Sequence, residues 1–272
     1  MRMQVEADLY LLDIRAFFED ENRSMLIEEA LSKLDAQRRE KARRIGRERG
    51  LAESLGAGLL LQLAVQRAET VRSEEAAGRA ETAQAVEAAG RAELVRFTGG
   101  AATRLTVTEL LKSLDASLPL VYQYKENGKP YFKNYPYYFN LSHSGDYVIC
   151  ALSEREVGAD LQVHRATDLE RLAGRYFSPA EIEAFRQAED RTAFFFRLWA
   201  RKEAYGKLTG KGIVDALGSD LWSMGTEIAG TLCWEECDKL PGYSMAVCQY
   251  TKNAVTGSEQ LKNAVNKGKI IL

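Results

Sequence analysis

The strongest constraint on the fold is an order of segments that occurs twice along the chain. Residues 34–61 read LDAQRREKARRIGRERGLAESLGAGLLL, and residues 177–204 read FSPAEIEAFRQAEDRTAFFFRLWARKEA. Each stretch combines a short capped helix, a charged segment and a long apolar helix, and each follows sequence typical of a strand. In the first half we expect a strand at 6–14 and helices at about 22–34 and 51–66. The repeated order predicts an α+β fold made of two similar subdomains.

The second half carries clear local signals. Residues 120–132 alternate β-forming side chains around the sequence ENGK, which predicts a hairpin. Residues 137–164 indicate three strands separated by tight turns. The sequence SPAE at 178–181 is a capping box with proline at the first helical position, and it opens a helix over 179–188. A longer helix is expected at about 190–209, and the segments TLCWEEC and YSMAVCQY indicate a final hairpin.

These elements suggest a division of the chain. We expect an N-terminal subdomain over residues 1–118, a C-terminal subdomain over 119–250 and a polar tail over 251–272. The first subdomain should contain a helical insertion at about 67–104, because the sequence EAAGRAE occurs twice within this Ala/Glu/Arg-rich stretch. The insertion has no pattern of a binding site, so it reads as an exposed arm produced by local duplication.

Composition and charge exclude several classes of function. The chain has 272 residues, is 46% hydrophobic and carries a net charge of −2, so a general nucleic-acid-binding surface is not expected. The segment 38–49, RREKARRIGRER, is strongly basic, and this local concentration suits a site for one anion. Glu6 and Asp8 interrupt the apolar N-terminal stretch, which argues against a secretory signal, and no apolar run is long enough to span a bilayer. We therefore expect a cytoplasmic protein without membrane contacts.

Four side chains recur at helical spacing in the helix at 190–209. Trp199, Lys202, Glu203 and Lys207 should lie on one face of this helix. One interpretation is a solvated face, in which Glu203 and Lys207 form an i,i+4 ion pair worth roughly 0.3–0.5 kcal/mol. The other interpretation is a site for a metal ion and a polyphosphate. The helix alone leaves both open.

The sequence GADLQ at 158–162 supplies a candidate partner for this face. On a strand, Asp160 and Gln162 point to the same side. Mg²⁺ prefers one or two carboxylates together with phosphate oxygens and water. Asp160 and Glu203 could provide these carboxylates, and Lys202 and Lys207 could contact the phosphates. An exposed carboxylate at a sheet edge is the alternative for Asp160.

A third motif, FNLSHSGDYV at 139–148, ends a strand in a tight turn. Ser142, His143 and the backbone amides near Gly145 could surround a phosphate group. A nucleophilic role for Ser142 is less favoured, because the chain lacks the G-x-S-x-G elbow and adjacent side chains on a strand point to opposite faces. The GKLTGKG segment also lacks the spacing of a P-loop.

Five motifs occur in one order: GKPYF, FNLSHSGDYV, VGADLQ, YFSPAEIEAF and LWARKEAYGKLTGKG. This ordered set, over residues 128–213, resembles the Sfp-type 4′-phosphopantetheinyl transferases. The resemblance implies a pseudo-dimer of two α+β subdomains with coenzyme A in the cleft between them and Mg²⁺ on its pyrophosphate. It also implies transfer of the 4′-phosphopantetheine group of coenzyme A to a serine of an apo acyl- or peptidyl-carrier protein, with release of adenosine 3′,5′-bisphosphate.

The resemblance also assigns roles to individual residues. Asp160, Glu203 and, as a neutral oxygen donor, Gln162 match the metal site, and Glu203 is in addition the candidate base for the serine proton. Lys207 matches the lysine near the leaving phosphate. The remaining positions match contacts to coenzyme A: Arg38, Lys41, Lys129, Pro130, Ser142, His143 and Lys202.

Two positions depart from the pattern. Many members of the family have glutamate where this chain has Gln162, so we expect weaker binding of the metal. Arg38 stands where lysine is frequent. Gln162 leaves open an alternative reading, a non-catalytic module that binds coenzyme A or a carrier protein. The natural carrier is not specified by the sequence, and we expect a monomer.

Overall fold

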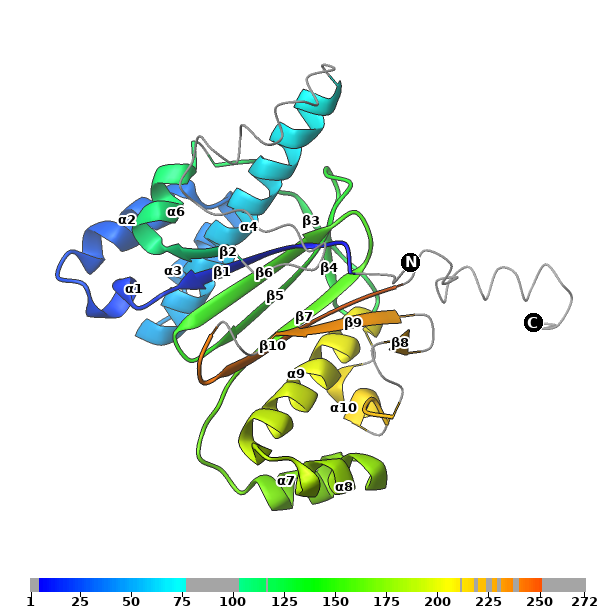
Figure 1. The fold of residues 1–272 in the computed structure, drawn as a ribbon. Helices are drawn as coiled ribbons and strands as arrows, with labels where there is room; N and C mark the ends of the chain where they lie inside the picture. Colours follow the sequence, from blue (N-terminus) through cyan, green and yellow to red (C-terminus); the bar gives the residue numbers. More distant parts are fainter. Residues whose placement is uncertain are drawn as a thin grey trace, which may run out of the picture.

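The computed structural model describes residues 5–76, 103–115, 117–210, 212–217, 220–223, 227–228, 231–236 and 240–250 (Figure 1). Most of the expected insertion, residues 77–102 with all but the first two residues of the EAAGRAE repeats, and the expected tail over 251–272 lie outside these residues. The described part of the chain forms two four-stranded sheets, one short hairpin and two groups of helices, which confirms the predicted α+β class. No helix in it is both long and apolar enough to cross a lipid bilayer.

The first sheet has the strand order β2-β1-β6-β5. Its strands are β1 (Asp8–Asp13), β2 (Thr103–Thr106), β5 (Tyr138–Ser144) and β6 (Tyr147–Ser153). Strand β1 is parallel to β2 and antiparallel to β6, and β6 is antiparallel to β5. The chain passes from the first sheet to the second after Ser153, since β6 pairs with β1 and β5 pairs with β6. The domain boundary expected near residue 118 stays a prediction.

In the described part of the chain a group of helices lies on one side of this sheet, with α4 in contact with β1, β5 and β6 (Figure 1). They are α1 (Ala16–Glu19), α2 (Arg23–Lys33), α3 (Ala36–Arg43), α4 (Glu48–Ala76) and α6 (Val107–Ser113). The apolar stretch of α4 forms the centre of the core, where Leu55, Leu59 and Leu60 are fully buried. Helix α4 is longer than the predicted 51–66 and includes the first residues of the expected insertion.

The second sheet has the strand order β7-β10-β9-β8. Its strands are β7 (Val157–Val163), β8 (Glu227–Ile228), β9 (Thr231–Glu236) and β10 (Tyr243–Tyr250). The helices around it are α7 (Leu169–Tyr176), α8 (Pro179–Gln187), α9 (Arg191–Thr209) and α10 (Gly212–Leu217). Helix α9 packs along β7 and β10, while α7 and α8 lie beyond it (Figure 1). The capping box of α8 is present in both directions between Ser178 and Glu181, as predicted.

Helix α9 approaches β7 very closely at Gly158. A Cβ atom on Gly158 would lie 2.1 Å from the carbonyl oxygen of Ala204 and 2.5 Å from the amide nitrogen of Leu208. Both of these atoms belong to the backbone of α9, so they cannot rotate away. The absence of a side chain at this position therefore sets the distance between the helix and the strand.

Strands β5 and β7 lie side by side at the edges of the two sheets, and polar side chains join them. Asn140, Ser142 and Ser144 of β5 accept hydrogen bonds from successive outward N–H groups of β7, those of Ala159, Leu161 and Val163, at 2.9, 3.3 and 3.0 Å. The hairpin of β3 (Tyr122–Tyr124) and β4 (Pro130–Phe132) follows α6 in the chain and precedes β5. The side-chain ladder between β5 and β7 brings residues of both sheets to one place.

Candidate active site

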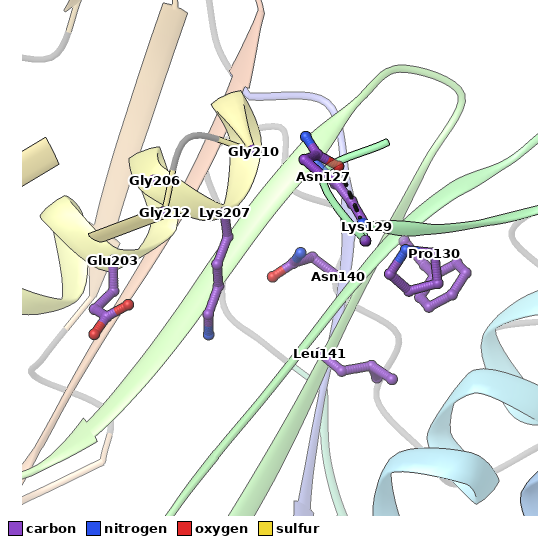
Figure 2. Close-up of a pocket in the computed structure, with 12 residues that line it drawn as sticks. Asn127, Lys129, Pro130, Asn140, Leu141, Glu203, Gly206, Lys207, Gly210 and Gly212 are labelled. Carbon is purple, nitrogen blue, oxygen red and sulfur yellow. Dashed lines mark hydrogen bonds between the residues drawn. The ribbon is translucent and has the colours of Figure 1, made fainter. Parts of the chain in front are cut away.

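A cavity of about 390 Å³ lies where the hairpin turn before β4, strand β5 and the C-terminal half of α9 meet (Figure 2). Figure 2 shows Glu203 and Lys207 projecting from α9, with Asn140 and Lys129 across from them. The cavity is lined by Asn127, Gly128, Lys129, Pro130, Phe139, Asn140, Leu141, Glu203, Gly206, Lys207, Gly210 and Gly212. Three of the sequence motifs, GKPYF, FNLSHSGDYV and LWARKEAYGKLTGKG, therefore each contribute residues to the lining of this cavity.

Asp160 is the most buried carboxylate of this region, with 2% of its surface exposed. Its Oδ1 atom accepts hydrogen bonds from Ser142 Oγ at 2.7 Å and from Lys207 Nζ at 2.6 Å. Its Oδ2 atom accepts one from Gln162 Nε2 at 2.8 Å. A buried carboxylate needs such partners, because an unpaired charge away from water is costly.

Glu203 provides a second carboxylate on the neighbouring helix. Burial raises the pKa of Glu203, and the negative charge of Asp160 raises it further. The ammonium of Lys207 and a hydrogen bond from the Trp199 side chain act in the opposite direction. The raised pKa means that the ionised form of Glu203 is less favoured here than in water, and a cation beside the two carboxylates would stabilise it.

Lys207 and Lys129 bring two ammonium groups to the cavity. Lys207 Nζ also donates to the carbonyl oxygen of Ala159 at 3.1 Å. Lys129 Nζ donates to the carbonyl oxygens of Val157 and Leu208, at 3.1 and 3.2 Å. Burial lowers the pKa of Lys129 to about 8, with the charge of Lys125 acting in the same direction. The ammonium groups of Lys129 and Lys207 thus both lie against the outer edge of β7. Both residues line the cavity, which therefore suits an anion.

Ser142 and His143 point to opposite sides of β5, as the strand period requires. Ser142 is buried and lies between Asp160 and Lys207, with its Oγ 3.0 Å from Lys207 Nζ. His143 is exposed on the other side, where its Nδ1 lies 3.4 Å from Glu53 Oε2. The structure therefore brings Ser142 into the carboxylate cluster and places His143 outside it.

The basic residues of α3 lie beyond the hairpin. Arg38 is half-buried, and its Nε donates to the hydroxyl of Tyr122 at 3.0 Å. Lys41 is exposed in the last turn of the same helix. Pro130 lines the cavity, whereas neither Arg38 nor Lys41 is among the described residues that line it.

Lys202 is not brought together with Glu203 and Lys207. Its ammonium is fully buried, 2.8 Å from Glu181 Oε2, and it donates to the carbonyl oxygen of Leu217 at 3.2 Å. Trp199 stacks on Phe195, with ring centroids 5.6 Å apart. The helical spacing suggested one shared face, but α9 is packed on several sides, so Lys202 serves the contact with α8 and α10.

Sequence reasoning missed Asn140 and Ser144, which hold β7 in register with β5. The signal was present as polar side chains at alternate positions of the strand, at 140, 142 and 144. It also missed Tyr122, whose partner Arg38 is 84 residues away in the chain. Such a distant pairing leaves no local pattern.

The donor set suits a magnesium ion in part. Among the described residues no group of three or more His, Cys, Asp or Glu side chains is arranged to hold a metal. Asp160 and Glu203 are nevertheless close enough for the charge of one to raise the pKa of the other. Two carboxylates fit a Mg²⁺ ion that takes its other ligands from phosphates and water. Gln162 donates its amide nitrogen to Asp160 here, so its oxygen is not directed at that carboxylate.

Comparison with known proteins identifies the family. The family model of the 4′-phosphopantetheinyl transferase superfamily matches residues 156–248. The 4′-phosphopantetheinyl transferase psf-1 of Bacillus pumilus is 38% identical over 141 residues, which cover 47% of this chain and 60% of that protein. The 4′-phosphopantetheinyl transferase Sfp of Bacillus subtilis is 34% identical over 138 residues, covering 46% and 60%.

A third relative is matched over more of its length. The 4′-phosphopantetheinyl transferase AcpT of Salmonella typhimurium is 41% identical over 142 residues, which cover 49% of this chain and 69% of that protein. The chain thus spans about 60% of the length of the two Bacillus relatives and more than two thirds of AcpT. The chain belongs to the 4′-phosphopantetheinyl transferase superfamily and is of the Sfp type.

Proposed function

We propose that this protein transfers the 4′-phosphopantetheine group of coenzyme A to a serine of an apo acyl- or peptidyl-carrier protein, in the presence of Mg²⁺. The observation that carries the proposal is the cluster of Asp160, Glu203 and Lys207 beside the cavity. Two carboxylates and an ammonium at one end of an anion-binding cavity are what phosphoryl transfer requires, because this chemistry depends on positioning and charge neutralisation.

The reaction breaks one bond of the pyrophosphate and forms one bond to the carrier. The serine oxygen attacks the β-phosphorus of coenzyme A, and the bond from this phosphorus to the bridging oxygen breaks. The electron pair of that bond leaves with adenosine 3′,5′-bisphosphate. Glu203 accepts the proton of the serine hydroxyl, and its raised pKa brings it nearer to the pH at which a base is most effective.

The other residues bind and orient the donor. Lys207 stabilises the negative charge that develops on the leaving phosphate, and Ser142 holds Lys207 and Asp160 in place. Lys129 and Pro130 form the wall for the adenine nucleotide, and Arg38 and Lys41 hold the 3′-phosphate. Asp160 and Glu203 would bind Mg²⁺, which when bound neutralises the pyrophosphate charge. Lys202 has no direct role in this scheme.

The two sheets and their helices also support a pseudo-dimer. Each half contains a strand followed by short helices and then a long helix that packs on the sheet: β1 through α4, and β7 through α9. In this arrangement coenzyme A lies in a cleft between the halves, at the end of the ladder that joins β5 to β7. The carrier protein then approaches the side on which Glu203 is open to the cavity.

The test is mass spectrometry of an apo carrier protein after incubation with this protein, coenzyme A and Mg²⁺. Transfer adds the mass of one phosphopantetheine group to the carrier serine and releases adenosine 3′,5′-bisphosphate in equal amount. Lys207→Met is the matched control, because it removes the ammonium and keeps the aliphatic stem. Binding of coenzyme A without any mass gain, with several acyl and peptidyl carriers, would instead favour the non-catalytic binding module.

A further inference from the structure

We infer that Tyr122 is a positioning residue that fixes the guanidinium of Arg38, so that this chain holds the 3′-phosphate of coenzyme A with an oriented two-pronged donor. The inference rests on the proposed function, in which Arg38 contacts that phosphate. Tyr122 lies in strand β3, outside the motifs of the family resemblance. Its contact explains why arginine, in place of the frequent lysine, suits position 38 in this chain.

Three groups form a short chain of hydrogen bonds. Arg38 Nε donates to the Tyr122 hydroxyl at 3.0 Å, and this hydroxyl donates to Asp35 Oδ2 at 2.8 Å. The Tyr122 hydroxyl therefore accepts one hydrogen bond with a lone pair and donates one with its only proton, which are the two roles that a phenol can take at once. Burial raises the pKa of Tyr122, so the hydroxyl keeps the proton that it donates. The guanidinium carbon also lies 5.3 Å from the centroid of the tyrosine ring.

Asp35 ties this arrangement to the start of helix α3. It is buried, and its Oδ1 atom accepts the backbone N–H of Arg38 at 3.0 Å as the N-cap of the helix. One carboxylate thus fixes the backbone of Arg38 and, through Tyr122, its side chain. Because the side chain of Arg38 is already held in place, it loses less rotamer freedom when a ligand binds, and the entropic cost of binding is lower.

The contact to Tyr122 leaves one edge of the guanidinium available. Within the described part of the chain, Arg38 makes its side-chain hydrogen bond through Nε, and its two terminal nitrogens have no hydrogen-bonding partner. These two nitrogens form the fork that matches a phosphate in a bidentate contact. A lysine at this position would present a point charge and would gain no such orientation from Tyr122.

Aromatic packing links this pair to the cavity. The ring of Tyr122 lies 6.0 Å from the ring of Phe139 and 5.7 Å from that of Phe132, measured between centroids. Phe139 lines the cavity, so Tyr122 stands directly behind its wall. On the other side, Gly58 of α4 leaves room for the stem of Arg38, because a Cβ there would lie 3.2 Å from Arg38 Cδ.

The test compares ligands that differ only in the 3′-phosphate. Tyr122→Phe keeps the ring and its packing but removes the acceptor for Arg38. We expect it to weaken binding of adenosine 3′,5′-bisphosphate by roughly tenfold in isothermal titration calorimetry, the size of one charge-assisted hydrogen bond, and to leave binding of adenosine 5′-phosphate unchanged. In transfer assays the KM for coenzyme A should rise, the KM for dephospho-coenzyme A should not, and kcat at saturation should stay the same.

The matched control is Tyr124→Phe on the same strand. The Tyr124 hydroxyl accepts a hydrogen bond from Gln37 at 3.1 Å and is exposed, so its removal should leave all four ligands unaffected. Equal losses for ligands with and without the 3′-phosphate in Tyr122→Phe would show that Tyr122 serves only the core, and this result would overturn the inference.

Arg38→Met separates this inference from the proposed function. It should remove the preference for the 3′-phosphate more completely than Tyr122→Phe does, and the double variant should behave like Arg38→Met alone. Loss of the preference in Arg38→Met with none in Tyr122→Phe would overturn only the role of Tyr122. An unchanged preference in Arg38→Met would overturn both the assignment of Arg38 and this inference. Absence of coenzyme A binding in the parent would mean that the proposed function itself is wrong.

Discussion

Lys207 Nζ lies 2.6 Å from Asp160 Oδ1, across the interface between helix α9 and strand β7. The carboxylate is almost fully buried, whereas 30% of the lysine side chain is exposed. A buried carboxylate and a partly exposed ammonium respond differently to loss of the partner. Without Asp160 the lysine can turn toward water, but without Lys207 the carboxylate stays in the protein with fewer hydrogen bonds.

Asp160→Asn should therefore abolish transfer while the protein remains folded. The amide keeps the shape and the contact to Ser142 but removes the charge that would hold Mg²⁺ beside Glu203. We expect transfer to fall at least about a hundredfold, the size of losing a preorganised electrostatic contact at a reaction centre. The measurement is the mass gain of an apo carrier at saturating Mg²⁺, with the thermal midpoint as the folding control. Activity within tenfold of the parent would remove Asp160 from the proposed metal site.

Gln162→Glu should strengthen the binding of Mg²⁺. The structure places Gln162 within hydrogen-bonding distance of Asp160, so glutamate at this position would add a full charge next to that carboxylate. Without metal the two like charges repel, and a hard cation relieves this repulsion. The Mg²⁺ concentration for half-maximal transfer should fall, and Mg²⁺ should raise the thermal midpoint more than it does in the parent. An unchanged or higher half-saturation point would show that residue 162 does not neighbour the metal.

Lys129 should make the binding of coenzyme A dependent on pH. Burial lowers its pKa to about 8, so its positive charge is present at lower pH and is lost as the pH rises through this value. Affinity for an anionic ligand should therefore fall between about pH 7 and pH 9, by roughly tenfold if one charge-assisted contact is lost. Calorimetric titration with coenzyme A across this range measures the effect.

The control for this prediction is Lys129→Met, which lacks the titrating group and keeps most of the stem. Its affinity should be lower at pH 7 and should change little with pH, so the two binding curves should converge in the alkaline range. Parallel curves for the parent and the variant would assign the pH dependence to another group.

Lys202→Met should affect stability and not the chemistry. The ion pair of Lys202 with Glu181 is fully buried, so removing one partner leaves an uncompensated charge. Such a loss costs roughly 3–5 kcal/mol of the free energy of unfolding. Glu181→Gln in the same protein should restore part of this loss, because it removes the unpaired charge. Its single carbonyl oxygen can still accept from one of the two N–H groups that Glu181 binds, those of Ser178 and Leu221. Urea unfolding measures the free energy of unfolding of the single and the double variant. A large drop in kcat of the folded Lys202→Met protein would contradict the prediction and show that Lys202 takes part in the reaction.

Local signals in the sequence predicted the elements around the site well. Helix α8 begins at Pro179 because its capping box satisfies the first N–H groups, and α9 ends at Thr209 because Gly210 takes the left-handed conformation, with φ of +72°. The two hairpins and the three strands at 137–164 also form as predicted. In each case the signal lies within a few residues of the element that it determines.

Contacts between distant segments were not accessible in the same way. The direction of Lys202 depends on where α8 and α10 pack, and helical spacing alone cannot fix it. The grouping of β5 and β6 with β1 depends on pairing across more than a hundred residues. For the same reason the site could be predicted as a set of residue types, whereas its support by Asn140, Ser144 and Tyr122 required the fold.

The ladder between β5 and β7 also affects which edge groups of β7 are open to pairing with another strand. An edge strand with unpaired N–H and C=O groups can take up a strand from another molecule. Here the side chains of Asn140, Ser142 and Ser144 occupy three N–H groups of β7, and Lys129 and Lys207 occupy the carbonyl oxygens of Val157 and Ala159. Lys129 and Lys207, which face the cavity, thus also satisfy carbonyl groups on this edge of β7, so the same side chains that are proposed to contact the ligand leave fewer edge groups open to pairing with another strand.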